Sequence, residues 1–314
     1  NRLGLGAGPV RKEENLIYFE KFILDNGLRV LVHEDPSTPI VAVNTLYNVG
    51  SKDESPERTG FAHLFEHLMF GGSAHVEDFD RPLQMAGGDS NAFTNSDLTN
   101  FYNTLPAEHL EVAFWLESAR MGYPNINPKE REVQRQVVLE EFSETCLNQP
   151  YGDVWHHLYK LAFQRHPYRW PTIGLTPEHI EEATLEDVRS FYHRFYCPNN
   201  AILVVAGPVQ TVEVRRLVEK WFGDLPAGPK YRRELPQEEP SRHLRRSELQ
   251  ADVPVDGLYM AFHMPGRDEF DFYVCDLLSD ILGNGSSSRL YRRLYKQQQL
   301  FSSIDAYITG SVEP

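Results

Sequence analysis

Two histidines and a glutamate lie within five residues of one another, at His63, Glu66 and His67. Residues four apart share one face of an α-helix, and at about 100° per residue Glu66 falls about 60° to one side of His63. On a helix, all three side chains would project within one arc. Two imidazoles at this spacing are typical ligands of a metal ion such as zinc.

The rest of this segment is apolar. A helix that is apolar on nearly all sides is normally buried, and three ionisable groups on a buried helix are costly unless something binds them. One alternative is a pair of ordinary helix histidines with a salt-bridging glutamate. The order His-x-x-Glu-His is the inverted form of the zinc-protease helix H-E-x-x-H, which favours the metal. The apolar neighbours are Phe61, Leu64, Phe65, Leu68, Met69 and Phe70.

A third ligand is needed, and the three cysteines are badly placed to supply it. Residues 127–148 read as a helix that has Pro128 near its start and contains no glycine. We expect Glu141 to face the core, because it continues the apolar stripe of Val137 and Val138. A site of His63, His67 and Glu141 leaves a fourth position for water. The neighbouring acids on this helix, Glu140 and Glu144, are more simply solvated.

These residues resemble the pitrilysin, insulin-degrading enzyme and mitochondrial processing peptidase family of inverted-motif zinc metallopeptidases. The 73 residues between His67 and Glu141 are close to the family's distance to its glutamate ligand. Val137 to Glu141 resembles the pattern whose last glutamate is that ligand. Further resemblance extends over most of the chain, at residues 60–70, 87–94, 166–168, 196–201 and 283–291.

The resemblance implies a zinc-dependent endopeptidase that hydrolyses extended or unfolded peptides, with one Zn²⁺ per chain. Glu66 would be the general base on a zinc-bound water and would pass the proton to the leaving amine. The segment Asn91, Ala92, Phe93 and Thr94 resembles the strand that holds substrate beside the metal by edge pairing. For Asn91 a second role stays open, which is to stabilise the turn beside Gly87 and Gly88.

One position departs from the family. Relatives commonly carry a second glutamate seven residues before the ligand, behind or near the metal, and Gln134 stands there instead. An amide can still form hydrogen bonds, but it supplies no negative charge. The alternative function is therefore a catalytically weak or non-enzymatic partner subunit of the same fold, because some relatives keep the fold without the site.

Apolar periodicity and turn residues predict an α+β fold, with a mixed, largely antiparallel sheet packed against helices. We expect a hairpin over 16–33 around the Asp25-Asn26-Gly27 turn. Further strands are expected at 40–49, within 84–104, and at 201–206, 258–263 and 303–308. Further helices are expected at 107–121, 154–163, 185–196, 212–222, 270–282 and 289–298.

The length favours two related domains. We expect an N-terminal tail at 1–15, a catalytic zinc-peptidase domain at 16–224, a proline-rich linker at 225–246 and a second repeat at 247–314 that is incomplete in this chain. When Gly285 is aligned with Gly72, the zinc-site positions of the second repeat are Asp276, Ser279 and Asp280, so this repeat would bind no metal.

The net charge of −14 argues against nucleic acid as a partner. The sequence contains no run of about 18 apolar residues, so we expect no membrane span. The expected partners are a peptide substrate and either a second family subunit or the chain's own missing C-terminal half. A soluble protein of the bacterial cytoplasm, the periplasm or an organelle would fit equally.

Overall fold

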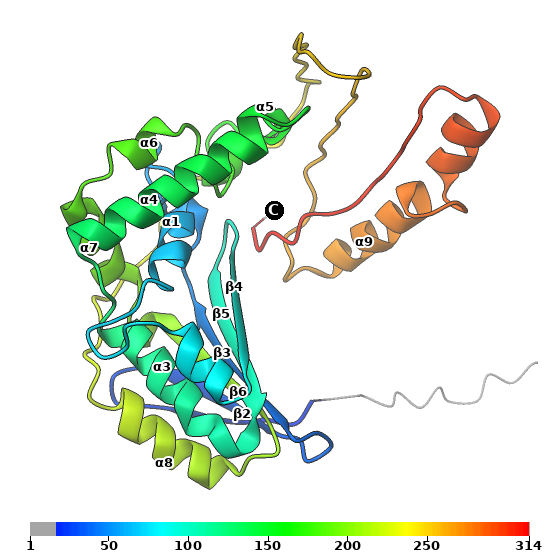
Figure 1. The fold of residues 1–314 in the computed structure, drawn as a ribbon. Helices are drawn as coiled ribbons and strands as arrows, with labels where there is room; N and C mark the ends of the chain where they lie inside the picture. The colour runs from blue at the N-terminus through cyan, green and yellow to red at the C-terminus, as the bar shows by residue number, and fades with distance from the viewer. Residues whose placement is uncertain (1–16, 314) are drawn as a thin grey trace, which may run out of the picture.

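The computed structural model describes residues 17–313, so the expected tail over 1–15 lies outside the described residues. Six strands form one mixed sheet in the order β1-β2-β6-β3-β5-β4 (Figure 1). Only β2 and β6 run parallel, so the sheet is largely antiparallel, as predicted. The strands are β1 (Glu20–Ile23), β2 (Arg29–Glu34), β3 (Ile40–Tyr47), β4 (Asp89–Thr94), β5 (Thr99–Pro106) and β6 (Ala201–Gly207).

The alternation of residues along the strands explains why the sheet has one covered face. On β3, Val41, Val43 and Tyr47 are completely buried, whereas Ala42 and Leu46 on the other face are only half-buried. Side chains of successive strand residues point to opposite faces. One face therefore packs into the core, and Figure 1 shows the helices gathered on that side of the sheet.

The predicted helices are present, although the segment 84–104 forms two strands rather than one. The helix over 185–196 begins as expected, because Thr184 and Asp187 form a reciprocal capping box. The helices are α1 (Phe61–Leu68), α2 (Asp80–Met85), α3 (Leu110–Gly122), α4 (Pro128–Phe142), α5 (Val154–Ala162), α6 (Glu178–Glu181), α7 (Leu185–Phe195) and α8 (Thr211–Phe222).

Helix α1 contacts α4, α7 and strand β4. Strand β4 is the last strand of the sheet, and within residues 17–313 it pairs only with β5, which leaves its other edge free there. This arrangement brings a helix from early in the chain, a helix from the middle and an open strand edge to one place (Figure 1).

The C-terminal part differs from the prediction in two segments. The strands expected at 258–263 and 303–308 are absent, and both segments are irregular. Strand formation depends on a neighbouring strand, and every strand of the described sheet lies between Glu20 and Gly207. The expected helices are present as α9 (Phe270–Gly283) and a π-helical segment at Tyr291–Gln297.

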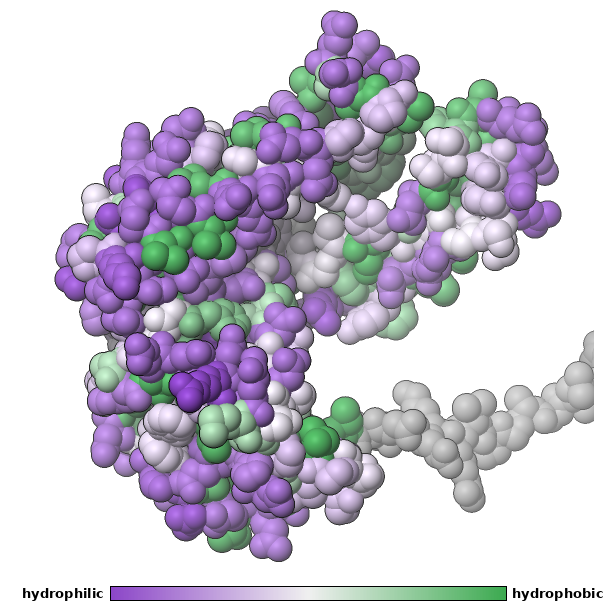
Figure 2. Space-filling model, viewed as in Figure 1, coloured by the Kyte–Doolittle hydropathy of each residue, from purple (hydrophilic) through white to green (hydrophobic). Residues whose placement is uncertain are grey.

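The segments before and after α9 contact the main body, where His263 lies 2.7 Å from the carbonyl oxygen of Ala162 and the N–H of Val312 donates to Asp97 at 2.9 Å. Helix α9 itself stands apart from the main body, with open space between them (Figure 2). Several of its large apolar side chains are about half exposed or more, among them Phe270, Leu277 and Ile281. None of the helices described over residues 17–313 has the length and apolarity to span a membrane.

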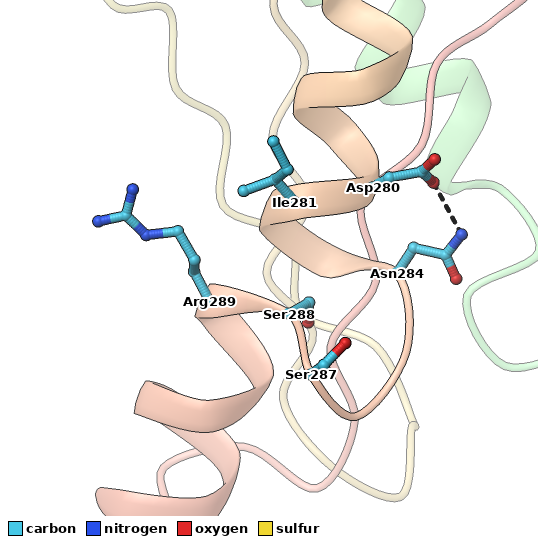
Figure 3. A pocket seen from close by; sticks show the side chains of 6 residues that line it. All are labelled: Asp280, Ile281, Asn284, Ser287, Ser288 and Arg289. Carbon is cyan, nitrogen blue, oxygen red and sulfur yellow. Dashed lines mark hydrogen bonds between the residues drawn. The ribbon is translucent and has the colours of Figure 1, made fainter. Parts of the chain in front are cut away.

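The turn after α9 lines an open pocket of about 500 Å³ (Figure 3). Asp280 there accepts a hydrogen bond from the Asn284 amide at 2.7 Å, and the Ser279 hydroxyl donates to the carbonyl of Asp276 at 2.8 Å. Asp276 and Asp280, which align with the two histidines of α1, therefore take part in local hydrogen bonds. Within the described residues, this part of the chain holds no group of side chains suited to a metal.

A buried ion pair lies in the core beneath the end of α1. Arg120 and Glu117 on α3 are 2% and 0% exposed, with Nε and Oε1 3.5 Å apart. The Arg120 guanidinium also lies 4.5 Å from the centre of the Phe101 ring, and the Asn103 amide donates to Glu117 at 2.9 Å. Removing one member would leave the other charge buried without its partner.

We therefore expect Arg120→Met to lower the free energy of unfolding by about 3–5 kcal/mol. Adding Glu117→Gln should recover part of this loss, because an amide still accepts from Asn103 and carries no charge. Urea unfolding of the wild type, the single and the double variant measures this. A double variant that is less stable than Arg120→Met would contradict the account.

Candidate metal centre

Helix α1 presents three polar side chains and buries the rest. Five of its eight residues are buried, and the three that are not are His63, Glu66 and His67. The residue just before the helix, its N-cap, is Gly60, whose φ of +89° suits glycine. The helix ends before Gly72, also at positive φ (+85°), where a Cβ would lie 2.6 Å from the carbonyl oxygen of Glu77. Both ends of the helix are therefore fixed by the backbone.

Helix α4 brings the third group. It begins with Asn127 as N-cap, whose side chain accepts from the Glu130 N–H, and has Pro128 in its first turn. After Phe142 it widens into a π-helical turn over Ser143–Leu147. Glu141 lies just before this turn, and α4 runs beside α1 (Figure 1).

The two imidazoles and the carboxylate converge. The Nε2 atoms of His63 and His67 are 3.2 Å apart. The Oε2 atom of Glu141 lies 3.3 Å from Nε2 of His67 and 3.6 Å from Nε2 of His63. Tetrahedral zinc with bonds of about 2.0–2.1 Å separates its ligand atoms by about 3.3 Å. The donor set therefore has the size and the chemistry that zinc requires.

Among residues 17–313 this is the one group of three or more His, Cys, Asp or Glu side chains that could hold a metal ion. Two imidazole nitrogens with a carboxylate are also the donors found in catalytic zinc sites. The Nδ1 atom of His63 is buried and has no hydrogen-bond partner in the part of the chain that the structure describes.

The electrostatics favour a cation at this point. Burial lowers the pKa of His63 to about 4, against the attraction of Glu141. A hydrogen bond from His67 lowers the pKa of Glu141, against its partial burial. A neutral imidazole and an ionised carboxylate are the forms that bind a metal ion.

The structure also corrects one expectation for α4. Glu141 does not face the core, because its side chain is 39% exposed, and Val137 is 42% exposed although Val138 is fully buried. Glu141 instead lies at the border of α4 that faces the histidines. Glu140 and Glu144 are exposed, as expected.

Glu66 is half-buried on α1, one residue before His67. Gln134 is half-buried on α4, two turns before Glu141. Its amide donates to Oε1 of Glu130 at 3.0 Å. The Glu130 carboxylate in turn lies against Gly71, where a Cβ would come within 2.4 Å of Oε1. Gln134 therefore contacts, through Glu130, the turn that follows α1.

The predicted substrate segment is strand β4. Asn91 and Phe93 are exposed, whereas Ala92 and Thr94 are half-buried. The carbonyl oxygen of the Asn91 side chain accepts from the N–H of Ala92 at 2.8 Å. This bond is local to the strand. The role of Asn91 toward a peptide therefore stays a prediction.

Sequence reasoning passed over one buried acid beside the site. Glu54 lies in the charged loop before α1 and is only 8% exposed. Its carboxylate accepts from the N–H groups of Gly60 and Ala62, at the start of the helix. The dense charges of that loop were a signal, but only the fold distinguishes the buried acid from its exposed neighbour Glu57.

Two family models match the chain. Residues 29–175 match the model described as insulinase (peptidase family M16), and residues 182–312 match the model described as peptidase M16 inactive domain. The chain is 32% identical over 304 residues to a zinc protease, PqqE, of Helicobacter pylori, which covers 95% of this chain and 68% of that protein. It is 26% identical over 295 residues to an uncharacterized zinc protease, YmxG, of Bacillus subtilis, covering 92% and 69%.

The crystal structure of a protease from Helicobacter pylori is similar, with a TM-score of 0.81 and 30% identity, covering 95% of this chain and 73% of that one. The chain therefore belongs to peptidase family M16, and its fold is the mixed-sheet fold of that family. Relatives in this family are named zinc proteases.

The low pKa of His63 predicts a pH dependence of stability in the metal-free protein. Between about pH 6.5 and pH 4, His63 is protonated in the unfolded chain but stays neutral in the folded protein. The free energy of unfolding should therefore fall as the pH is lowered through this window. His63→Gln removes this contribution, so the difference between wild type and variant should change by about 3 kcal/mol across it. Urea unfolding in the presence of a chelator measures it, and a constant difference would contradict it.

Adjacent glutamates on α4 provide a matched pair for zinc binding. Glu141→Gln removes a charged ligand atom that lies 3.3 Å from His67, so we expect zinc to be lost from the purified protein. Glu140→Gln makes the same chemical change one residue away at an exposed position, and zinc should be retained. Zinc content by mass spectrometry distinguishes the two. Equal occupancy in both variants would contradict the ligand set.

Proposed function

We propose that this chain is a zinc-dependent endopeptidase that acts on extended or unfolded peptides. The observation that carries the proposal is the convergence of His63, His67 and Glu141 at 3.2–3.6 Å, with Glu66 on the same helix. Family membership supports it, because relatives are named zinc proteases. The three converging residues would hold one Zn²⁺.

Zinc, when bound, supplies positive charge that makes water more acidic and polarises a peptide carbonyl. Glu66 would take the proton of the attacking water and donate it to the leaving amine. Its place on α1 supports this role, because helical spacing puts it about 60° to one side of His63, and it is not one of the three converging groups. Gln134, two turns before Glu141 on α4, would contribute through the hydrogen bond that its amide donates to Glu130.

Substrate would lie along β4. This strand contacts α1, and among the described residues its outer edge pairs with no strand, so a peptide that adds to the sheet there would lie near the histidines. Main-chain pairing reads the peptide backbone more than its side chains, which suits broad sequence preference. Asn91, Ala92, Phe93 and Thr94 are the residues that would contact it.

A second reading is a weakly active or non-enzymatic partner subunit. It is favoured by the match of residues 182–312 to a model described as an inactive domain, and by the amide at Gln134. An intact ligand set would be unnecessary in such a subunit, whereas it is needed for hydrolysis. Direct assay therefore decides between the two.

We expect Glu66→Gln to retain zinc and to lower the hydrolysis of an unstructured peptide by about 10²–10⁴-fold. The isosteric amide cannot accept the proton, but it leaves the three ligands in place. Peptide cleavage and zinc content are measured on the same samples, with chelator-treated wild type as the metal-free control. Turnover at the wild-type rate would refute the role of Glu66, and a wild type that binds zinc without cleaving would favour the subunit reading.

A further inference from the structure

Glu54 is a buried acid whose partners are backbone groups. Its Oε2 accepts from the N–H of Gly60 at 3.0 Å, and its Oε1 accepts from the N–H of Ala62 at 2.8 Å. Burial raises the pKa of Glu54 to about 8, while these N–H groups lower it. Each of its two oxygens therefore accepts a hydrogen bond from one backbone donor at the start of α1.

The start of α1 has no other side-chain cap. The N-cap residue is Gly60, which has no side chain to accept from the first N–H groups of the helix. These groups need partners when a helix end is buried, and negative charge is favourable there. Glu54 supplies the hydrogen-bond partners, from six residues upstream of the N-cap.

This cap lies next to a metal ligand. Ala62, which donates to Glu54, immediately precedes His63. The Nε2 of His63 lies 3.2 Å from that of His67 and 3.6 Å from Glu141. Metal sites tolerate errors of only about 0.5 Å in ligand position. A shift of the first turn would therefore displace His63 from the other two ligands.

The loop that carries Glu54 is itself anchored at the two residues that precede it. Lys52 pairs with Asp97 at 2.6 Å, and both side chains are almost fully buried. Asp53 receives two bonds from the Arg233 guanidinium, at 2.7 and 2.9 Å. The backbone that leads into Glu54 is thus held by a buried ion pair at Lys52 and a bidentate pair at Asp53, so its carboxylate is a fixed point for α1.

We propose that Glu54 is a positioning residue of the metal centre, which holds the first turn of α1 so that His63 meets His67 and Glu141. This inference rests on the proposed zinc site and deepens it. It predicts that the geometry and affinity of the site depend on a carboxylate that does not touch the metal.

Glu54→Gln replaces one acceptor oxygen by an NH₂ group that faces an N–H donor. We expect the dissociation constant for Zn²⁺ to rise by about 10–100-fold, as for other residues that orient metal ligands. The visible absorption bands of the Co²⁺-substituted protein should also shift, because they report ligand geometry. Glu54→Asp keeps both carboxyl oxygens as acceptors but shortens their reach, so we expect a smaller loss.

Glu34 provides the matched control. Its Oε1 accepts from the N–H and the hydroxyl of Thr211 at 2.7 and 2.8 Å, so it caps α8, a helix without metal ligands. Glu34→Gln should leave the Zn²⁺ affinity and the Co²⁺ spectrum unchanged. All proteins are compared well below their unfolding temperatures.

The outcomes separate the two claims. Weaker Zn²⁺ binding and an altered Co²⁺ spectrum in Glu54→Gln or Glu54→Asp, with Glu34→Gln like the wild type, support the inference. Wild-type affinity and spectrum in both Glu54 variants overturn the inference alone. Failure of the wild type to bind Zn²⁺ overturns the proposed function, and this inference with it.

Discussion

The arrangement around α1 depends on one constraint, which is that two imidazole nitrogens and a carboxylate oxygen are held within 3.2–3.6 Å of one another. Three electron-pair donors at this separation repel unless a proton or a cation lies between them. The lowered pKa of His63 keeps this ring neutral, because burial opposes charge on it, and a neutral ring can present a lone pair at Nε2. A divalent cation satisfies all three donors at once.

The rest of the fold can be understood from this requirement. The three donors come from segments separated by 73 residues, so α1 and α4 must be fixed to each other independently of the chain between them. Five buried residues of α1 pack into the core, and the turn after it packs against Glu130 of α4. Strand β4 contacts the same helix with a free edge. The site, its supports and a surface for an extended chain therefore occupy one end of the sheet.

Much of this could be predicted from the sequence, for local reasons. Helical spacing places His63 and His67 on one face, and the Asn26-Gly27 turn and Thr184 cap specify their own conformations. What failed depends on distant partners. Val137 is exposed although it adjoins buried Val138, and 258–263 stays irregular because no described strand lies beside it. The proposed role of Glu54 required the fold, since only the fold shows that its carboxylate accepts from the N–H groups of Gly60 and Ala62.

The most direct test of the central claim is anomalous X-ray diffraction at the zinc absorption edge, from crystals of the protein grown with Zn²⁺. The account predicts one strong anomalous peak per chain at about 2.0–2.1 Å from Nε2 of His63, Nε2 of His67 and a carboxylate oxygen of Glu141. No peak at that point, with the three side chains held only by each other, would contradict it.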